Sequence, residues 1–178
     1  MLTTIEEIKS WFEWAAKSPF NPIVIDTIDG MYQTVSDSVC VRLGIENPTK
    51  APHGIAWFDI YDDMREQLAV LSGAGKGVIM LSHITYQEKV LRGGAVIQAA
   101  SFNVSGKTKP FLAGMADQIL HFDTAEGKEG VERIIRCTAT AGVEAGDRWN
   151  MLPEEISRGN SPLDAATSLL KCFYDTEK

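Results

Sequence analysis

The stretch IVIDTID at residues 23–29 decides the predicted fold. Three β-branched residues lead directly into Asp26 without polar alternation, which is typical of a central strand of a parallel sheet, covered on both faces. The carboxyl end of such a strand is where open α/β sheets bind their ligands. Asp26 is therefore a candidate ligand-binding residue. The alternative is that Asp26 only caps the following turn or helix, as Asp commonly does.

The size and composition of the chain predict one soluble domain. Its 178 residues suffice for one well-buried α/β core, and 44% hydrophobic with 23% charged residues are ordinary globular values. No apolar run approaches the roughly 20 residues of a membrane span. The N-terminal segment carries acids where a signal peptide carries bases. We therefore predict a single domain over 1–178 that is cytoplasmic and has no membrane partner.

Charge and cysteine usage exclude some classes of protein. The formal net charge is −7, so the surface as a whole does not favour nucleic acid. Cys40, Cys137 and Cys172 are widely spaced and match no zinc or redox pattern. Because free cysteines are usually buried, we expect reduced thiols that are mostly inaccessible.

Apolar periodicity and turn residues predict an α/β order of elements. An amphipathic helix over 4–17 precedes the strand at 23–26, and a second buried strand is expected at 78–83. Further helices are expected over 30–43, 58–71, 111–118 and 163–174, the last within the tail 160–178, with late strands over 119–122 and 132–138. Helices between buried strands favour a mostly parallel sheet flanked by helices.

Two stretches combine glycine with lysine, as phosphate loops do. In residues 73–77 the lysine is followed by glycine rather than by Ser or Thr, and a strand follows the stretch instead of preceding it. The stretch Gly106-Lys107-Thr108 has the right last three residues, but Ser101 stands where the first glycine is required and no buried strand is expected to lead in. We interpret the first stretch as a turn and reject the second as a Walker A motif, so the sequence predicts no Walker A motif.

A histidine and a basic segment follow the second strand. His83 closes that strand, where it contacts either a bound phosphate or only a backbone group. Residues 84–110 look irregular, and loops longer than about 15 residues in compact domains are usually functional or disordered. Bases neutralise phosphates, and aromatic rings stack on unpaired bases. We predict a mobile loop that contacts single-stranded DNA through Tyr86, Lys89, Arg92, Lys107 and Lys109; the alternative is a mobile loop that contacts only solvent.

The chain resembles one family through stretches that occur in a fixed order: IVIDTIDGMY, VCVRLGIENP, GKGVIMLSHI, GMADQILHF and EAGDRWNMLPEEI. The order is similar to that in phage-encoded RecA-like P-loop ATPases, which are associated with single-strand annealing and homologous recombination. The resemblance covers about residues 5–157. It implies a RecA-like core, ATP and Mg²⁺ as cofactors, and a location in the host-cell cytoplasm.

The resemblance also assigns roles to individual residues. Asp26 is similar to the Walker B acid, which holds Mg²⁺, and the neighbouring Thr27 is expected at the nucleotide. His83 is similar to the residue that couples the nucleotide to the second DNA-binding loop. Residues 84–110 would form that second loop, and residues 44–56 would form the first.

The chain departs from the family pattern before the Walker B strand. The strand, phosphate loop and helix that precede Walker B in family members, together with an early catalytic acid, have no counterpart in the sequence. We therefore expect an N-terminally incomplete core with an uncovered sheet edge or apolar surface. Self-association or a P-loop-containing partner would cover that surface. Arg148 is expected to reach the nucleotide of a neighbouring subunit.

Three functional hypotheses remain open. In the first, the chain is a module of a recombination ATPase that supplies Walker B, the sensor and the DNA loops. In the second, it is a non-catalytic binding or regulatory protein derived from such an ATPase. The third is an unrelated hydrolase that uses Asp26 and His83 as an acid–base pair, but no nucleophile is placed for it.

Overall fold

The structure is a computed structural model that describes residues 4–127, 130–159 and 161–174. Within these ranges, no helix has both the length and the apolar character needed to cross a membrane.

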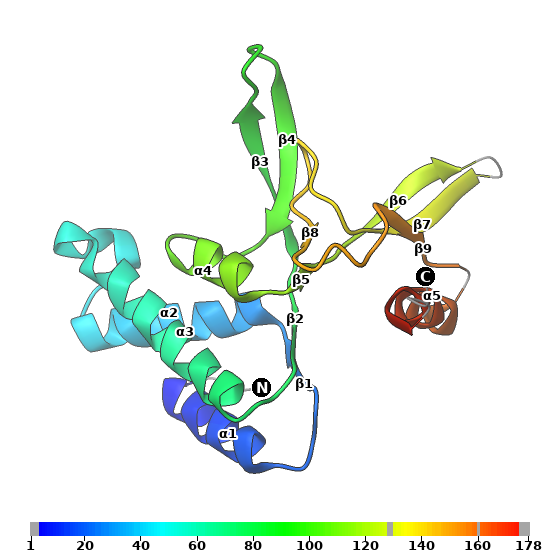
Figure 1. Ribbon diagram of the computed structural model, residues 1–178. Helices are drawn as coiled ribbons and strands as arrows, with labels where there is room; N and C mark the ends of the chain where they lie inside the picture. Colours follow the sequence, from blue (N-terminus) through cyan, green and yellow to red (C-terminus); the bar gives the residue numbers. More distant parts are fainter. Residues whose placement is uncertain (1–3, 128–129, 160, 175–178) are drawn as a thin grey trace. The chain divides into compact units, whose positions relative to one another are not determined.

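The chain divides into two compact units, whose helices and strands are labelled in Figure 1. Unit 1 consists of Met1–Ile84 and Phe102–Leu112, and unit 2 consists of Thr85–Ser101 and Ala113–Lys178. Each unit therefore contains two separate stretches of the chain.

Unit 1 begins with the predicted amphipathic helix, α1 (Ile5–Lys17). Thr4 Oγ1 accepts the Glu7 N–H at 3.2 Å, and Glu7 Oε2 accepts the Thr4 N–H at 3.3 Å. This capping box satisfies two N–H groups that the first turn leaves without helical partners. The helix buries Ile8 and Phe12.

Two longer helices complete the helical part of unit 1: α2 (Ile28–Leu43) and α3 (Ile55–Gly73). Gly44 ends α2 with a positive φ of 64°, which glycine adopts without steric cost. The segment between the helices forms two 3-10 turns, η1 (Pro48–Lys50) and η2 (Pro52–Gly54). The helices share an apolar core whose fully buried side chains include Phe12, Val35, Val39, Ile60, Met64, Leu68 and Leu71.

The decisive stretch forms β1 (Ile23–Asp26), which pairs in parallel with β2 (Val78–Leu81) from Ile23 opposite Val78 to Asp26 opposite Leu81. The expectation that β1 is covered on both faces is wrong. Ile23 and Ile25 are buried, whereas Val24 is 49% exposed. On the same face of β2, Ile79 and Leu81 are 47% and 44% exposed. The apolar run reflects one packed face and one open face.

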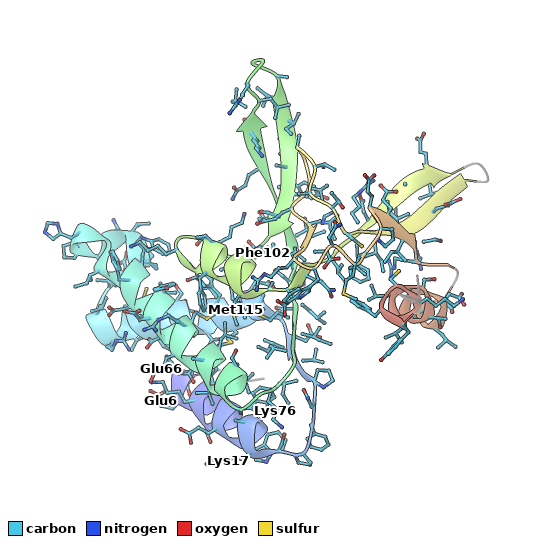
Figure 2. The ribbon with its side chains drawn as sticks, viewed as in Figure 1. Glu6, Lys17, Glu66, Lys76, Phe102 and Met115 are labelled. Carbon is cyan, nitrogen blue, oxygen red and sulfur yellow. The ribbon has the colours of Figure 1, made fainter. Side chains whose placement is uncertain are left out.

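The glycine-rich turn after α3 is hydrogen-bonded to the segment that leads into β1, and Figure 2 labels Lys76 of this turn. Lys76 Nζ donates to the carbonyl oxygens of Ser18 and Phe20 at 2.6 and 3.0 Å. Asn21 Oδ1 accepts the Gly77 N–H at 2.8 Å. The lysine ammonium is hydrogen-bonded to backbone carbonyls, so the interpretation of residues 73–77 as a turn is confirmed.

Residues 84–110 are not the irregular loop that the sequence predicted. They form β3 (Ile84–Val90), β4 (Val96–Phe102) and the start of α4 (Thr108–Met115). β3 and β4 make a two-stranded sheet whose connecting turn is closed by the Leu91 N–H to the Ala95 carbonyl at 2.8 Å. Nearly all of β3 is exposed. Because neither face of this strand is packed, its sequence lacks the alternation of apolar and polar residues from which a strand is predicted.

Unit 2 contains small antiparallel sheets and a helix. β5 (Gln118–Ile119) pairs with β8 (Gly146–Asp147), and β7 (Gly130–Arg136) pairs with both β6 (His121–Gly127) and β9 (Glu155–Ser157). The helix is α5 (Pro162–Tyr174). A small apolar cluster of Ile135, Cys137 and Ile156 is packed against Leu120, Leu152, Leu169 and Cys172.

The mixed α/β class is thus confirmed, but the mostly parallel sheet is not found. Of the strand pairs with a described register, β1–β2 is parallel and the three in unit 2 are antiparallel. The late strands were expected at a sheet edge, whereas they form sheets of their own.

Candidate functional site

The carboxyl ends of β1 and β2 bring the two predicted site residues to one edge. Asp26 is the last residue of β1 and lies opposite Leu81, the last residue of β2. His83 follows two positions later. Asp26 is exposed, and within the described part of the chain no side chain forms a hydrogen bond or ion pair with its carboxylate. It is therefore an open oxygen ligand at the edge where parallel strands bind ligands.

Thr27 starts the helix that follows the acid. Its Oγ1 accepts the Gly30 N–H at 3.1 Å, so its hydroxyl oxygen caps α2. The peptide bond between Asp26 and Thr27 is cis. The N-terminal end of α2 therefore begins directly at the strand-end acid.

A third residue, Asp29, completes the cluster and was not singled out from the sequence. Its Oδ1 accepts the backbone N–H of His83 at 3.1 Å, and its Oδ2 accepts ring Nδ1 at 2.8 Å. The Asp29 side chain is only 11% exposed, whereas that of His83 is 75% exposed. The available signal was an acid three residues after the strand-end acid, in the first turn of the helix.

The contact changes the pKa of both partners. The hydrogen bond to Asp29 and the charge of Asp29 raise the pKa of His83 above 6.5, with a further contribution from the charge of Asp26. Burial alone would raise the pKa of Asp29, but the hydrogen bonds from His83 and from the Thr27 side chain outweigh it and lower that pKa below 3.8. Near neutral pH Asp29 is therefore a carboxylate that favours a protonated His83 ring.

The backbone of His83 is tied to the segment that returns from β4. Its carbonyl accepts the Asn103 N–H at 3.0 Å, and Ser82 Oγ accepts the same N–H at 3.1 Å. The Ser82 hydroxyl donates to the His83 carbonyl at 3.0 Å. His83 thus contacts α2 through its ring and N–H, and the end of the hairpin through its carbonyl.

Two of the predicted DNA-contacting residues lie in unit 1. Lys107 Nζ is 3.7 Å from the centre of the Phe58 ring, and Lys109 Nζ is 5.5 Å from that of Phe102. The Phe102 ring is labelled in Figure 2 at the end of β4. A Cβ on Gly106 would lie 3.7 Å from the Trp57 ring, so the loop before α4 runs close to the start of α3. Two basic groups of unit 1 thus each lie near an aromatic ring.

The same loop requires a correction concerning phosphate loops. We expected no buried strand before Gly106-Lys107-Thr108, but β4, which is buried at Ala100 and Ser101, precedes it and α4 begins at Thr108. Ser101 still replaces the first required glycine, and the Lys107 ammonium lies on an aromatic ring. These two facts sustain the interpretation that the stretch is not a Walker A motif.

The other three predicted DNA-contacting residues belong to unit 2. Tyr86 and Lys89 lie on β3, and Arg92 lies in the turn that follows it. All three are exposed. The expected first loop, residues 44–56, contains η1 and η2.

Arg148 also lies in unit 2, where it is engaged locally. Its Nη1 donates to Asp117 Oδ1 at 3.2 Å, its Nη2 donates to the Gly114 carbonyl, and its backbone N–H donates to the Asp117 carbonyl at 2.8 Å. The guanidinium is 46% exposed. Its assignment to a neighbouring nucleotide remains a prediction.

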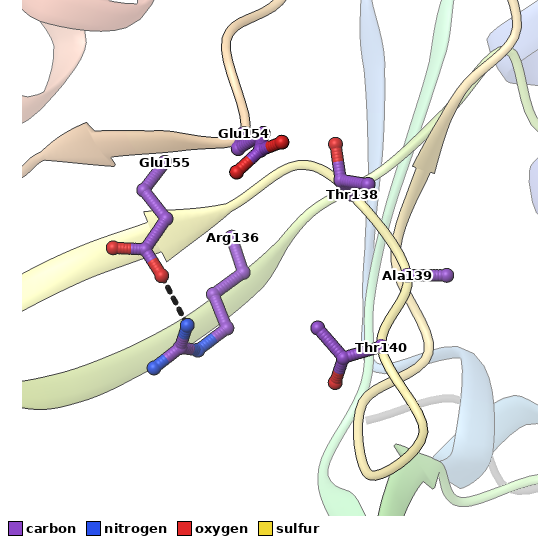
Figure 3. A pocket seen from close by; sticks show the side chains of 6 residues that line it. All are labelled: Arg136, Thr138, Ala139, Thr140, Glu154 and Glu155. Carbon is purple, nitrogen blue, oxygen red and sulfur yellow. Dashed lines mark hydrogen bonds and ion pairs between the residues drawn. The ribbon is translucent and has the colours of Figure 1, made fainter.

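Unit 2 also contains a shallow pocket of about 170 Å³ (Figure 3). The pocket is lined by Arg136, Thr138, Ala139, Thr140, Glu154 and Glu155. Its only basic group, Arg136, is already paired with Glu155 and with Asp123. The lining thus carries one positive charge and two negative charges, and the pocket is a weaker candidate for a nucleotide site than the edge of β1 and β2.

The comparison with known proteins identifies the class. A family model described as an AAA domain matches residues 1–149, and the chain therefore belongs to that family of nucleotide-binding, ATPase-type domains. No curated protein and no solved structure matches the chain.

Domains of this family generally use a nucleotide and Mg²⁺, and the site fits them only in part. Mg²⁺ is usually held by one or two carboxylates together with substrate phosphates, and Asp26 is an open carboxylate of this kind. In the described ranges, no group of three or more His, Cys, Asp or Glu side chains could hold a metal ion. The two glycine–lysine stretches are engaged in other contacts. Among the described residues, the site thus has one open carboxylate that could hold a metal ion, and neither glycine–lysine stretch forms a phosphate cradle.

Proposed function

We propose that this chain is a module of a RecA-like, phage-encoded recombination ATPase that acts on single-stranded DNA. The observation that supports this most is the placement of His83. The residue lies beside Asp26 and Asp29 at the carboxyl edge of β1 and β2, and the chain continues from it directly into the β3–β4 hairpin. A change at the nucleotide would therefore reach the hairpin through one residue.

The proposed mechanism is positional. Asp26 supplies the carboxylate for Mg²⁺, and the phosphate loop comes from a polypeptide segment outside these 178 residues. His83 makes different contacts in the nucleotide-bound and nucleotide-free states, and a ligand shifts a protein between two states only through such a difference. The responding elements are β3 with its turn and the Asn103 contact.

The open face of the β1–β2 sheet supports the need for a partner. Val24, Ile79 and Leu81 are exposed there, next to Asp26. Parallel sheets are almost always covered on both faces. We propose that a P-loop-containing polypeptide packs on this face, in the host-cell cytoplasm, and places its phosphate loop at Asp26.

Binding to a fluorescein-labelled oligo(dT) in low salt tests the DNA part of the proposal. The double variant Lys89→Ala/Arg92→Ala should bind more weakly, and its affinity should fall less steeply with salt because fewer phosphates are neutralised. The double variant Lys9→Ala/Lys17→Ala removes the same charge from α1 and is the matched control. Absence of binding by the unaltered chain in low salt would overturn the DNA assignment.

ATP hydrolysis tests the nucleotide part and separates it from the alternative. With an added P-loop polypeptide the unaltered chain should restore hydrolysis, and Asp26→Asn should not. The alternative is a non-catalytic binding or regulatory protein that acts through self-association or a full-length partner, and the lack of a phosphate cradle favours it. Binding to such a polypeptide without any hydrolysis would support this alternative.

A further inference from the structure

Asp29 forms two hydrogen bonds to one residue, and their geometry restricts the His83 ring. Oδ1 holds the backbone N–H at 3.1 Å while Oδ2 holds Nδ1 at 2.8 Å. A carboxylate that is bonded to both the main chain and the ring of a residue fixes the side-chain rotamer as well as the position. Asp29 is mostly buried and the ring is mostly exposed, so a carboxylate held within the protein restrains a ring that otherwise faces solvent.

The hydrogen bond also determines which ring nitrogen is available. An ionised carboxylate only accepts hydrogen bonds, so Nδ1 must carry a proton. In a neutral ring, Nε2 is then an acceptor and would repel a phosphate oxygen. In a protonated ring, Nε2–H is a donor that can bind one. No described residue forms a hydrogen bond with Nε2.

We propose that Asp29 is a positioning residue that fixes the His83 ring in the Nδ1–H form, leaving Nε2 as the atom that meets a phosphate oxygen once the ring is protonated. The ligand class rests on the proposed function; the positioning does not. Asp29 from α2 is hydrogen-bonded to the ring, and the charge of Asp26 at the end of β1 also acts on it. Both charges favour the protonated ring.

Long-range ¹H–¹⁵N spectra of the histidine rings test the proposal on the full chain without nucleotide or DNA. In the unaltered protein at pH 8.5, His83 should be in the Nδ1–H form, and its titration midpoint should lie above 6.5. In Asp29→Asn the midpoint should fall towards 6.5 and the Nε2–H form should appear. Asp29→Glu, which keeps the charge, should retain part of the shift.

Asp62→Asn is the matched control, because it removes an exposed carboxylate whose described partner is Arg65. It should leave the His83 signals unchanged. An Nε2–H form at pH 8.5 in the unaltered protein would overturn the proposal, whether or not any variant folds. So would an unchanged His83 midpoint in folded Asp29→Asn. Failure to bind DNA or nucleotide would count against the proposed function and leave these readouts intact.

Discussion

The Lys107 ammonium lies 3.7 Å from the centre of the Phe58 ring, and this contact joins the loop before α4 to the first turn of α3. A cation over an aromatic face is attracted by the ring quadrupole, typically by about 0.5–1 kcal/mol at exposed sites. Phe58 itself is 47% exposed. The pair combines a positive charge and an aromatic ring, which are the two groups that the proposed binding of single-stranded DNA uses.

Lys107→Ala should weaken binding to oligo(dT) and lower the salt slope by roughly 1, as expected for the loss of one phosphate contact. Lys17→Ala removes an equal charge at the end of α1 and should leave the slope unchanged. Fluorescence anisotropy over a series of NaCl concentrations measures both. Equal slopes for the two variants would remove Lys107 from the DNA site.

Residues of β1 alternate between a packed face and an open face, so substitutions on the two faces should differ in their effect on stability. Ile25→Ala should cost about 2–5 kcal/mol in the free energy of unfolding, because it leaves a cavity in the packed face. Val24→Ala lies on the open face and should change that free energy by less than about 0.5 kcal/mol. Urea unfolding followed by circular dichroism measures both. A large loss in Val24→Ala would mean that the face is covered in solution.

The pair of His83 and Asp29 predicts a pH-dependent stability. The pKa of His83 is raised above 6.5 in the folded protein, so its contribution is fully present below pH 6.5 and is lost as the pH rises through the raised value. The pKa of Asp29 is lowered below 3.8, so its contribution is lost as the pH falls through that lowered value. His83→Gln should therefore lower the Tm more at pH 5.5 than at pH 8.5. A difference in Tm that does not vary with pH would contradict the pairing.

The ion pairs between α2 and α3 predict that Arg42 contributes more to the stability of the fold than Arg65. Arg42 contacts Asp59 and Asp63 at 3.2 Å each, and the Asp63 side chain is only 13% exposed. Arg42→Ala should cost about 1 kcal/mol, because it leaves a largely buried carboxylate without its partner. Arg65→Ala removes an exposed pair within one helix and should be nearly neutral. Thermal unfolding at low and high salt distinguishes the two, since screening should reduce the Arg42 effect.

Cys137 should resist alkylation in the folded protein. Burial, with smaller effects from Cys172 and Asp147, raises the pKa of its thiol to about 11, and the thiolate is the reactive form. Iodoacetamide at pH 8 should label Cys137 only after denaturation, as judged by peptide mass spectrometry. Partly buried Cys172 should be labelled sooner. Rapid labelling of Cys137 under native conditions would contradict its burial.

The sequence was most informative where packing leaves a periodic trace. The capping box at Thr4, the helical stripe of α1 and the strand at Ile23 were all predicted, because each places apolar or capping residues at a fixed spacing. β3 was missed because both of its faces are exposed and its side chains do not alternate. The run of apolar residues in β1 indicated a strand, but the sequence did not show that one face of this strand is packed and the other is exposed.

The residues of the candidate site could likewise be predicted only where their position along the sequence indicates their role. Asp26 and His83 were predicted from their places at strand ends, and parallel pairing then brings them to one edge. Asp29 was not predicted because its role depends on the direction of the His83 ring, which no spacing in the sequence encodes. Its acidic character in the first turn of α2 is equally expected of a residue that only stabilises the helix dipole.

The division of the chain into interleaved stretches constrains how this protein can be cut or recombined. Within unit 2, the Ala100 N–H donates to the Gly142 carbonyl at 2.8 Å, and the Glu144 N–H donates to the Ala100 carbonyl at 3.1 Å. A protease that cleaves after Leu112 would therefore leave the hairpin on one fragment and its hydrogen-bond partners on the other. A single crossover that transfers one unit whole therefore also transfers a stretch of the other, either Phe102–Leu112 of unit 1 or Thr85–Ser101 of unit 2.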